Sequence, residues 1–411
     1  MLLRVRLLSR IACGMLLAQC VASWPLWLGT QVFPQVPVLA FLQSVPPAFD
    51  LVLTSCLALA GLATLISSFA GQPSASRIIR YSWRAVMLFL LLLMLLNQHR
   101  IQAWAWQGIL IALCFQLRSP GQTLTLLRWL TISIYFYSAV SKCDASFLQT
   151  HGQVLLDGFL NVAGGQKLDS PWLRSILIAG FPLGELLVSL LLAIPGTRRW
   201  GCLMSLVLHL MLITVLGPLG LNHHPPVLIW NLFFLLQNPV LFPGRVAEPV
   251  AEGTRTIWSS PRSLLLALVI LVAPALEWFD RMDVWPAWGL YASRGAKVQV
   301  EISRSQFDSL PESLRPFSTP LPQEPNWLRV DLFRWSFAET GAPANPEDRF
   351  LLGVANSLTD PLPDGSFRIT HFSTANRQTG NRTRVDLQTH EELRRFQEHY
   401  WLGTTPRKKF N

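Results

Sequence analysis

Ionisable side chains inside or beside long apolar stretches are the residues of this sequence that could do chemistry. Lys142 directly follows the run TISIYFYSAVS, and His99 stands with Arg100 between two apolar runs. Glu185 and His209 each lie inside a further run. Ionisable groups within membrane-spanning segments face a cavity or one another, and they are candidates for a functional site. We therefore expect the side chains of His99 and Lys142 to face an interior cavity.

Glu185 and His209 each allow a second interpretation. A hydrogen bond from Glu185 to a neighbouring helix is as compatible with the sequence as a catalytic role. A histidine in the middle of an apolar helix is more often packed and hydrogen-bonded than catalytic, and we favour this interpretation for His209.

The apolar runs beside His99 and Lys142 are short for membrane crossings. Only twelve residues separate Arg84 from the polar group Asn97-Gln98-His99-Arg100, and a helix of that length covers about 18 Å. The hydrocarbon core of a bilayer is about 30 Å thick. The run between Arg128 and Lys142 is similarly short. The polar group 97–100 and Lys142 are therefore both expected below the outer membrane surface. Tilt of the helices, snorkelling of the side chains or local thinning of the bilayer could instead bring them to the interface.

The composition is that of a multi-pass membrane protein. Of 411 residues, 51% are hydrophobic and only 14% are charged, whereas about 25% are charged in soluble domains. Uncharged apolar runs recur as far as residue 279 and then stop. We predict an all-α transmembrane domain over 1–279 and a small soluble α+β, strand-rich domain over 280–411. The transmembrane domain is expected to hold nine helices, at 11–28, 50–70, 85–97, 102–117, 129–142, 172–194, 200–217, 225–242 and 263–279.

Basic residues give the predicted helices an orientation. Arginines gather at alternate helix ends, as at Arg77, Arg80 and Arg84, and cytoplasmic loops carry such an excess. We predict a cytoplasmic N-terminus and, after nine crossings, an extracytoplasmic C-terminal domain; in a bacterium the membrane would be the inner one. Arginines at helix ends, where they meet lipid headgroups, account for the net charge of +10. The expected partner is therefore the bilayer and not nucleic acid.

The C-terminal part has patterns of mixed secondary structure. Strand-like runs occupy 297–303, 327–337, 349–355 and 366–374. Thr389 and Glu392 have the spacing of a capping box and predict a helix over 389–401. We expect packing or surface roles for the histidines of this part, which are His371, His390 and His399.

Five segments, in order, resemble the vitamin K-dependent gamma-glutamyl carboxylase family and its bacterial relatives (HTTM-type membrane domains). The resemblance covers about residues 80–245. The segments are NQHRIQAWAWQ (97–107), YFYSAVSKCDASFL (135–148), GFPLGELLVSLLL (180–192), VLHLM (207–211) and NPVLF (238–242).

The resemblance implies a site for quinol oxidation. Lys142 would be the base that deprotonates a reduced quinone, such as vitamin K hydroquinone or menaquinol, with His99 as its partner. Burial in an apolar pocket lowers the proton affinity of a lysine, which such a base needs near neutral pH. The supporting residues would be Asn97, Asp144, Glu185 and His209. The chain has a small C-terminal domain, and Leu212 stands where the family often has asparagine; we therefore expect an epoxidase-like activity and not protein carboxylation.

Two other functions remain open. The membrane domain could be a non-catalytic scaffold of the DoxX/MauE type that supports redox or assembly proteins outside the cytoplasm. Alternatively, histidines of the outer face could hold a metal ion; the four are His99, His151, His223 and His224. We favour no metal, because adjacent histidines rarely reach one ion and the six cysteines have no metal-binding or disulfide spacing.

Overall fold

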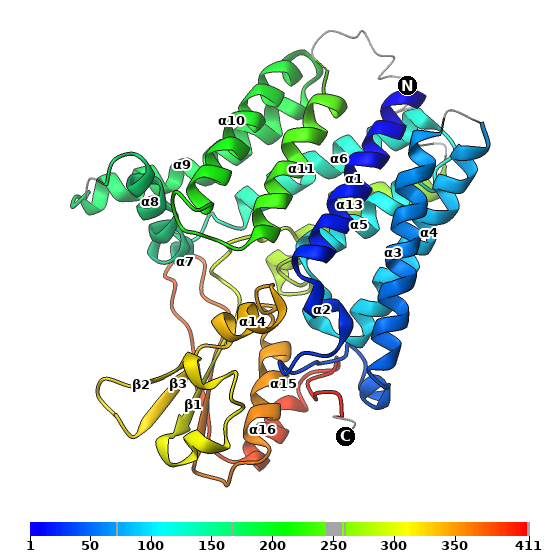
Figure 1. The fold of residues 1–411 in the computed structure, drawn as a ribbon. Coiled ribbons are helices and arrows are strands. Elements are labelled where there is room, and N and C mark those ends of the chain that lie inside the picture. The colour runs from blue at the N-terminus through cyan, green and yellow to red at the C-terminus, as the bar shows by residue number, and fades with distance from the viewer. Residues whose placement is uncertain (71–72, 166–167, 244–256, 259, 409–411) are drawn as a thin grey trace. The chain divides into compact units, whose positions relative to one another are not determined.

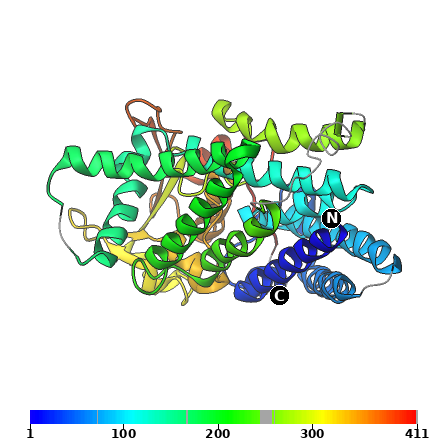
Figure 2. The same cartoon turned by 90° about the horizontal axis from the view of Figure 1, so that it is seen from above.

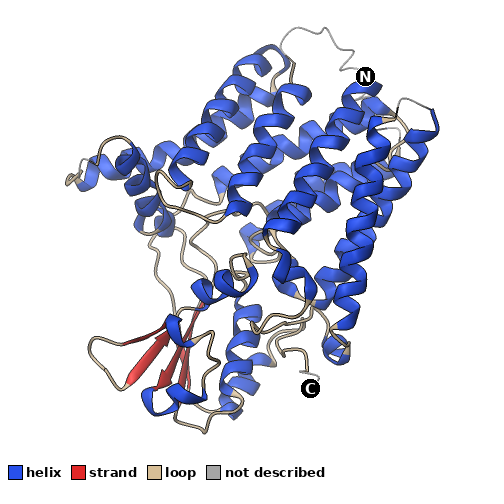
Figure 3. Ribbon diagram, in the orientation of Figure 1, coloured by secondary structure: helices blue, strands red, loops and turns tan. Residues whose placement is uncertain are grey.

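The computed structural model describes residues 1–70, 73–165, 168–243, 257–258 and 260–408. The chain is mostly helical and contains one sheet (Figure 3). It divides into two compact units. The first unit contains 1–21, 57–90 and 103–293, and the second contains 22–56, 91–102 and 294–411. Because each unit combines several segments, the predicted single boundary near residue 280 stays a prediction.

The first unit is built from helices. Helices α6 and α9 pack on each other, and α10 packs on both α9 and α11. Helices α10 and α11, drawn in green, lie side by side in both views (Figures 1 and 2). Three helices, α1, α3 and α4, contribute residues to both units. The helices are α1 (Leu2–Ala22), α3 (Ala48–Phe69), α4 (Pro73–Leu96), α5 (Ala103–Cys114), α6 (Pro120–Val140), α7 (Ala145–Gln149), α8 (His151–Val162), α9 (Pro171–Ala193), α10 (Arg198–Leu216), α11 (Pro225–Leu241) and α13 (Pro261–Leu271), with 3-10 turns η3 (Pro195–Thr197) and η4 (Ala273–Phe279).

Among the described residues, six helical segments are long and apolar enough to cross a membrane. This confirms an integral multi-pass membrane protein, but it does not confirm nine crossings. Helix α5 has 12 residues and α11 has 17, so both are shorter than a usual span. Helix α6 has 21 residues, but they include Arg128 and several hydroxyl side chains. The six segments are 2–22, 48–69, 76–96, 171–193, 195–216 and 261–279.

Local sequence explains where the helices of the first unit begin. Ser119 and Ser170 are followed by proline and accept hydrogen bonds from Gln122 N and Leu173 N. A serine N-cap satisfies a free amide of the first turn, and proline at the first helical position has no amide to satisfy. These signals start α6 and α9, the two helices that carry the central residues of the site.

The second unit contains a five-stranded antiparallel sheet with strand order β2-β3-β1-β4-β5 (Figure 3). Central strand β1 pairs Val300 with Val330 on β3 and with Ile369 on β4. Helix α15 packs on β1 and β4, and the core between them includes Phe350 and Val354. The strands are β1 (Lys297–Ser303), β2 (Ser318–Pro320), β3 (Trp327–Val330), β4 (Phe367–Phe372) and β5 (Arg384–Leu387); the helices are α2 (Trp24–Leu28), α14 (Leu332–Thr340), α15 (Asp348–Thr359) and α16 (His390–Gln397), with 3-10 turns η1 (Ala40–Ser44), η2 (Gln98–Arg100), η5 (Arg304–Ser309) and η6 (Arg315–Phe317).

Some predicted elements of this unit are confirmed and others are wrong. The strands at 297–303 and 366–374 are β1 and β4, and the Thr389–Glu392 capping box begins α16. The run 349–355 is helical and belongs to α15. A short, continuously apolar run does not distinguish a buried helix from a strand. The run 327–337 is strand β3 and then helix α14, because Asp331 caps the helix at Arg334 N.

A buried ion cluster joins three distant segments of the second unit. Asp50, in the first turn of α3, pairs with Arg100 and with Arg407, whose Nη1 lies 2.7 Å from Asp50 Oδ2. All three side chains are buried. Arg100 also donates to the carbonyls of Leu26 and Trp27. We call these charged residues, Asp50, Arg100 and Arg407, the Asp50 cluster.

Candidate functional site

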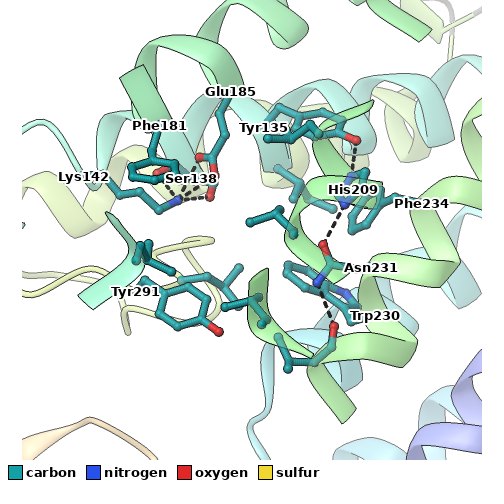
Figure 4. Close-up of a pocket in the computed structure, with 17 residues that line it drawn as sticks. Tyr135, Ser138, Lys142, Phe181, Glu185, His209, Trp230, Asn231, Phe234 and Tyr291 are labelled. Carbon is teal, nitrogen blue, oxygen red and sulfur yellow. Dashed lines mark hydrogen bonds and ion pairs between the residues drawn. The ribbon is translucent and has the colours of Figure 1, made fainter. Parts of the chain in front are cut away.

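A small cavity in the first unit is lined by three of the six predicted site residues, Lys142, Glu185 and His209 (Figure 4). Its volume is about 60 Å³, which holds a few water molecules and is far below the roughly 300–1,000 Å³ of pockets for small molecules. The wall is mainly apolar, with polar groups from α6, α9, α10 and α11. The polar and aromatic side chains that line it are Tyr135, Ser138, Lys142, Phe181, Glu185, His209, Trp230, Asn231, Phe234 and Tyr291.

Lys142 is paired with Glu185 on one wall of the cavity (Figure 4). Its Nζ lies 2.8 Å from Glu185 Oε2 and 3.0 Å from Oε1. It also donates to Ser138 Oγ at 2.6 Å and to the Ser138 carbonyl at 3.0 Å. The side chains of Lys142 and Glu185 are 3% and 13% exposed. The pair therefore links the end of α6 to α9, and the three protons of a lysine ammonium all have acceptors.

His209 belongs to a hydrogen-bonded chain on the facing wall. Its Nδ1 lies 2.8 Å from Asn231 Oδ1, and the Asn231 amide donates to the Val227 carbonyl. Nδ1 therefore carries the proton, and Nε2 accepts from the Tyr135 hydroxyl at 2.5 Å. Asn238 donates to the Tyr135 oxygen at 2.9 Å. These are the contacts of a packed, hydrogen-bonded histidine, and a supporting role for His209 in catalysis stays a prediction.

Replacing Tyr135 with phenylalanine is expected to destabilise the first unit by about 1–3 kcal/mol, because His209 and Asn238 each lose a buried partner. Thermal unfolding in detergent measures the change. Tyr137→Phe is the control on the same helix; its hydroxyl donates to the Leu271 carbonyl at a more exposed position, so the loss should be smaller. Equal losses of stability in the two variants would contradict a stabilising role for the buried hydrogen bonds of Tyr135.

Asp144, a predicted supporting residue, is the N-cap of α7. Its Oδ1 accepts from Phe147 N at 2.7 Å. A carboxylate at this position satisfies a free amide and complements the helix dipole. The observed contact is thus one that positions α7 directly after Lys142.

His99 and Asn97 lie in the second unit, and neither is among the described residues that line the cavity of Lys142. The His99 ring is fully buried between Phe33 and Phe350. Its Nε2 lies 2.9 Å from the Pro343 carbonyl and 3.1 Å from Ser336 Oγ. Asn97 Oδ1 accepts from the His99 amide and shapes η2. The predicted joint role of Lys142 and His99 therefore stays a prediction.

Gln98, between these two residues, makes three side-chain hydrogen bonds. Its Nε2 donates to the carbonyls of Pro37 and Gly403 at 3.0 and 2.6 Å, and its Oε1 accepts from Arg349 Nε at 2.8 Å. Asn345 donates to its backbone carbonyl. The polar segment 97–100, which the sequence predicts to lie below the outer membrane surface, is buried and hydrogen-bonds to distant segments of the second unit.

Stability of the second unit should depend on pH through His99. Burial lowers the pKa of His99 from about 6.5 to about 3. Because the unfolded chain binds the proton more readily, stability is complete above pH 6.5 and falls as pH drops from 6.5 toward 3, by up to about 1.4 kcal/mol per unit. The His99→Gln variant keeps a hydrogen-bond donor at this position but does not titrate. It is expected to flatten the pH dependence of the stability of the second unit between pH 7.5 and 5. Equal slopes for both proteins in thermal unfolding would exclude His99 as the cause.

Three of the four histidines in the metal hypothesis, His99, His151 and His223, have hydrogen-bond partners of their own. Among the described residues, no group of three or more His, Cys, Asp or Glu side chains is placed to hold a metal ion. His151 Nδ1 lies 2.7 Å from Ser293 Oγ, and His223 Nδ1 lies 3.1 Å from the Tyr291 hydroxyl. His99 belongs to the other unit. The geometry gives the metal hypothesis no support.

Several residues of the cavity were not identified from the sequence. Ser138 and Tyr135 lie on α6, four and seven residues before Lys142, or about one and two helical turns, so helical spacing could have found them. Asn231 and Tyr291 come from distant segments and carry no local signal. Trp288 and Tyr291 have positive φ values of 66° and 59°, which bulky residues rarely adopt and which the sequence does not reveal.

A second, larger depression lies beside the cavity. It is an apolar groove of about 460 Å³ between α8, α9 and α10. Phe181 and Leu208 line both the groove and the cavity. Gly180 and Gly184 line the groove on α9, and open space lies beside each. This apolar groove is large enough for a small molecule or for part of a lipid chain.

The fold and these helices define an integral multi-pass membrane protein with a strand-containing C-terminal part. Residues 121–225 match the family model of MauE, described as methylamine utilisation protein MauE. The match extends from α6 to the start of α11 and includes Lys142, Glu185 and His209. It overturns the resemblance to vitamin K-dependent carboxylases, whose motifs were short and individually unspecific. No curated protein matches the chain, and no solved structure matches it.

Proposed function

We propose that this protein is a non-catalytic membrane accessory protein of the MauE type. The observation that carries the proposal is the Lys142–Glu185 pair: Lys142, the one lysine among the described residues that line the cavity, makes four polar contacts, two of them to Glu185 and two to Ser138. A general base needs a free lone pair, whereas an ion pair at the end of α6 fastens two helices. The volume of about 60 Å³ beside it supports the same conclusion, because it is far below the volume of pockets that hold small molecules.

The match to MauE supports an accessory role, since it covers the helices that build this pair. We propose that the second unit lies outside the cytoplasm, with the N-terminus inside, and that its exposed surface binds an extracytoplasmic protein. The basic helix ends support this orientation. Fusions of alkaline phosphatase and of green fluorescent protein after Lys408 test this orientation. Only phosphatase activity is expected, and fluorescence without phosphatase activity would show that the second unit lies in the cytoplasm.

Site-specific photo-cross-linking tests the accessory role. A photoreactive residue replaces Phe333 on α14 or Val385 on β5, both exposed in the second unit, and Leu265 on α13 is the matched control in an apolar helix. The first two positions are expected to give an adduct with the same protein in host membranes. That protein should also decline in a strain lacking the gene and recover with the wild-type chain. Normal levels without the gene would contradict an accessory role.

Binding of a membrane quinone is the second candidate function. The apolar groove favours it, because Phe181 and Leu208 connect the groove to the wall that carries Glu185. In this hypothesis Lys142 remains the base and His99 its partner. Menaquinol or vitamin K hydroquinone is supplied to membranes with oxygen, and epoxide is measured for wild type and Lys142→Ala. The accessory proposal expects no epoxide from either; epoxide lost only in the variant would establish the quinol reaction instead.

A further inference from the structure

Trp401 is the most exposed of the large apolar side chains that the structure describes, at 93%. It follows α16 in the second unit and directly precedes the segment Leu402–Lys408. Exposure of a whole indole ring to water leaves a large apolar surface unburied, which is unfavourable.

The segment after Trp401 is fastened to an early part of the chain. Gly403 N donates to the Val38 carbonyl at 2.8 Å, and Arg407 N donates to the Gln35 carbonyl at 2.7 Å. Lys408 N donates to the Gln43 carbonyl at 3.1 Å. These bonds lie within the second unit and set the C-terminal segment alongside residues 35–43.

Residues 35–43 lie next to two membrane-spanning helices. Helix α3 begins at Ala48, and its first turn provides Asp50 for the pair with Arg407. Helix α4 ends at Leu96, and Gln98 just beyond it donates to the Gly403 carbonyl at 2.6 Å. Both helices are among the six segments long and apolar enough to span a bilayer. The start of α3 and the end of α4 therefore place this part of the second unit at the level where the chain enters and leaves the membrane.

Other side chains around these helix ends suit a membrane–water interface. Phe41 is 76% exposed in η1, and Phe49 is exposed in the first turn of α3. Lys408 is exposed beside Gln43. Tryptophan is enriched where its ring can sit at headgroup level, and lysine is attracted to anionic lipid.

We infer that Trp401 and Phe41 form an interfacial anchor, which holds the C-terminal segment of the second unit in the headgroup layer of the bilayer. The lipid surface is the partner, because the Trp401 segment is hydrogen-bonded to residues directly before α3 and after α4. The anchor does not depend on the accessory role, since neither Trp401 nor Phe41 is among the described residues that line the cavity.

Spin labels at single cysteines test the anchor in the full chain. All labelled variants carry Cys143→Ser, which removes the exposed cysteine. The Cys143→Ser protein without a further substitution is the control for background labelling. Labels are placed through Trp401→Cys, Phe41→Cys and, as the control in the same unit, Val385→Cys on β5. The protein is reconstituted in vesicles of phosphatidylethanolamine and phosphatidylglycerol. Collisions with oxygen, which is concentrated in the bilayer, are compared with collisions with a water-soluble nickel complex.

Labels at 401 and 41 are expected to have an oxygen-to-nickel collision ratio several-fold above that at 385. A label at 401 with the same ratio as 385 would place the segment in water and overturn the anchor. Shielding from both agents would also overturn it, by showing that protein covers the surface. Thermal unfolding that matches the background verifies that each labelled variant is folded.

Discussion

Replacing Asp50 with asparagine is expected to lower the stability of the second unit by about 3–5 kcal/mol. The carboxylate pairs with Arg100 and Arg407, and all three side chains are buried. Loss of the negative charge leaves two buried guanidinium groups without their counter-ion, which is far more costly than the net value of an ion pair. Asparagine keeps the size of the side chain, so packing against Gly29 is preserved. Thermal unfolding or hydrogen exchange of residues 22–56 measures the loss.

Glu391→Gln is the control for charge removal. Glu391 pairs with Arg394 and Arg395 on the exposed face of α16, where such pairs contribute at most about 1 kcal/mol. A similar small effect for Asp50→Asn would mean that water reaches the Asp50 cluster. Partial recovery in the double variant Asp50→Asn/Arg407→Met would identify the uncompensated guanidinium as the cause.

Lys142→Met is expected to destabilise the first unit by about 3–5 kcal/mol, because the Glu185 carboxyl loses its partner in a mostly apolar wall. The double variant Lys142→Met/Glu185→Leu replaces the whole pair with apolar side chains and should recover most of this loss. Thermal unfolding in detergent provides the measurement. Arg174→Met, which breaks a more exposed pair with Asp157, should cost less than about 1 kcal/mol.

The double variant also separates the two candidate functions. If Lys142 only fastens α6 to α9, Lys142→Met/Glu185→Leu should restore the level of the partner protein together with stability. A stable double variant that no longer supports the partner would show that the charges themselves are needed. The accessory proposal in its structural form would then fail.

The sequence was most informative where one short segment contained all the evidence. Alternation in 297–303 predicted β1, and the spacing of Thr389 and Glu392 predicted the start of α16. The strand prediction for 349–355 was wrong because all seven residues of this run are buried in α15, and a short run without an exposed position does not reveal a helical period. The nine predicted crossings were not confirmed, because a run of apolar residues defines a helix more reliably than it defines a crossing.

The candidate site shows a different limit. Lys142 and Glu185 were both singled out, but their pairing spans 43 positions and had no signal in the sequence. The sequence predicted that His99 lies below the outer membrane surface, and its side chain is buried. Its hydrogen-bond partners Ser336 and Pro343 lie more than 230 residues later in the chain. Burial of a polar residue can be inferred from its neighbours along the chain. The partner that satisfies it depends on tertiary structure.

The Asp50 cluster has a consequence for biosynthesis. Asp50 and Arg407 are separated by 357 positions, so at roughly 5–20 residues per second a ribosome needs on the order of 20–70 s between them. During that interval the start of α3 holds a carboxylate whose second arginine does not yet exist. Maturation of the second unit is therefore completed after translation of its last segment, and a nascent chain that stops early lacks the hydrogen bonds that Arg407 donates to Asp50, Gln35 and Val45.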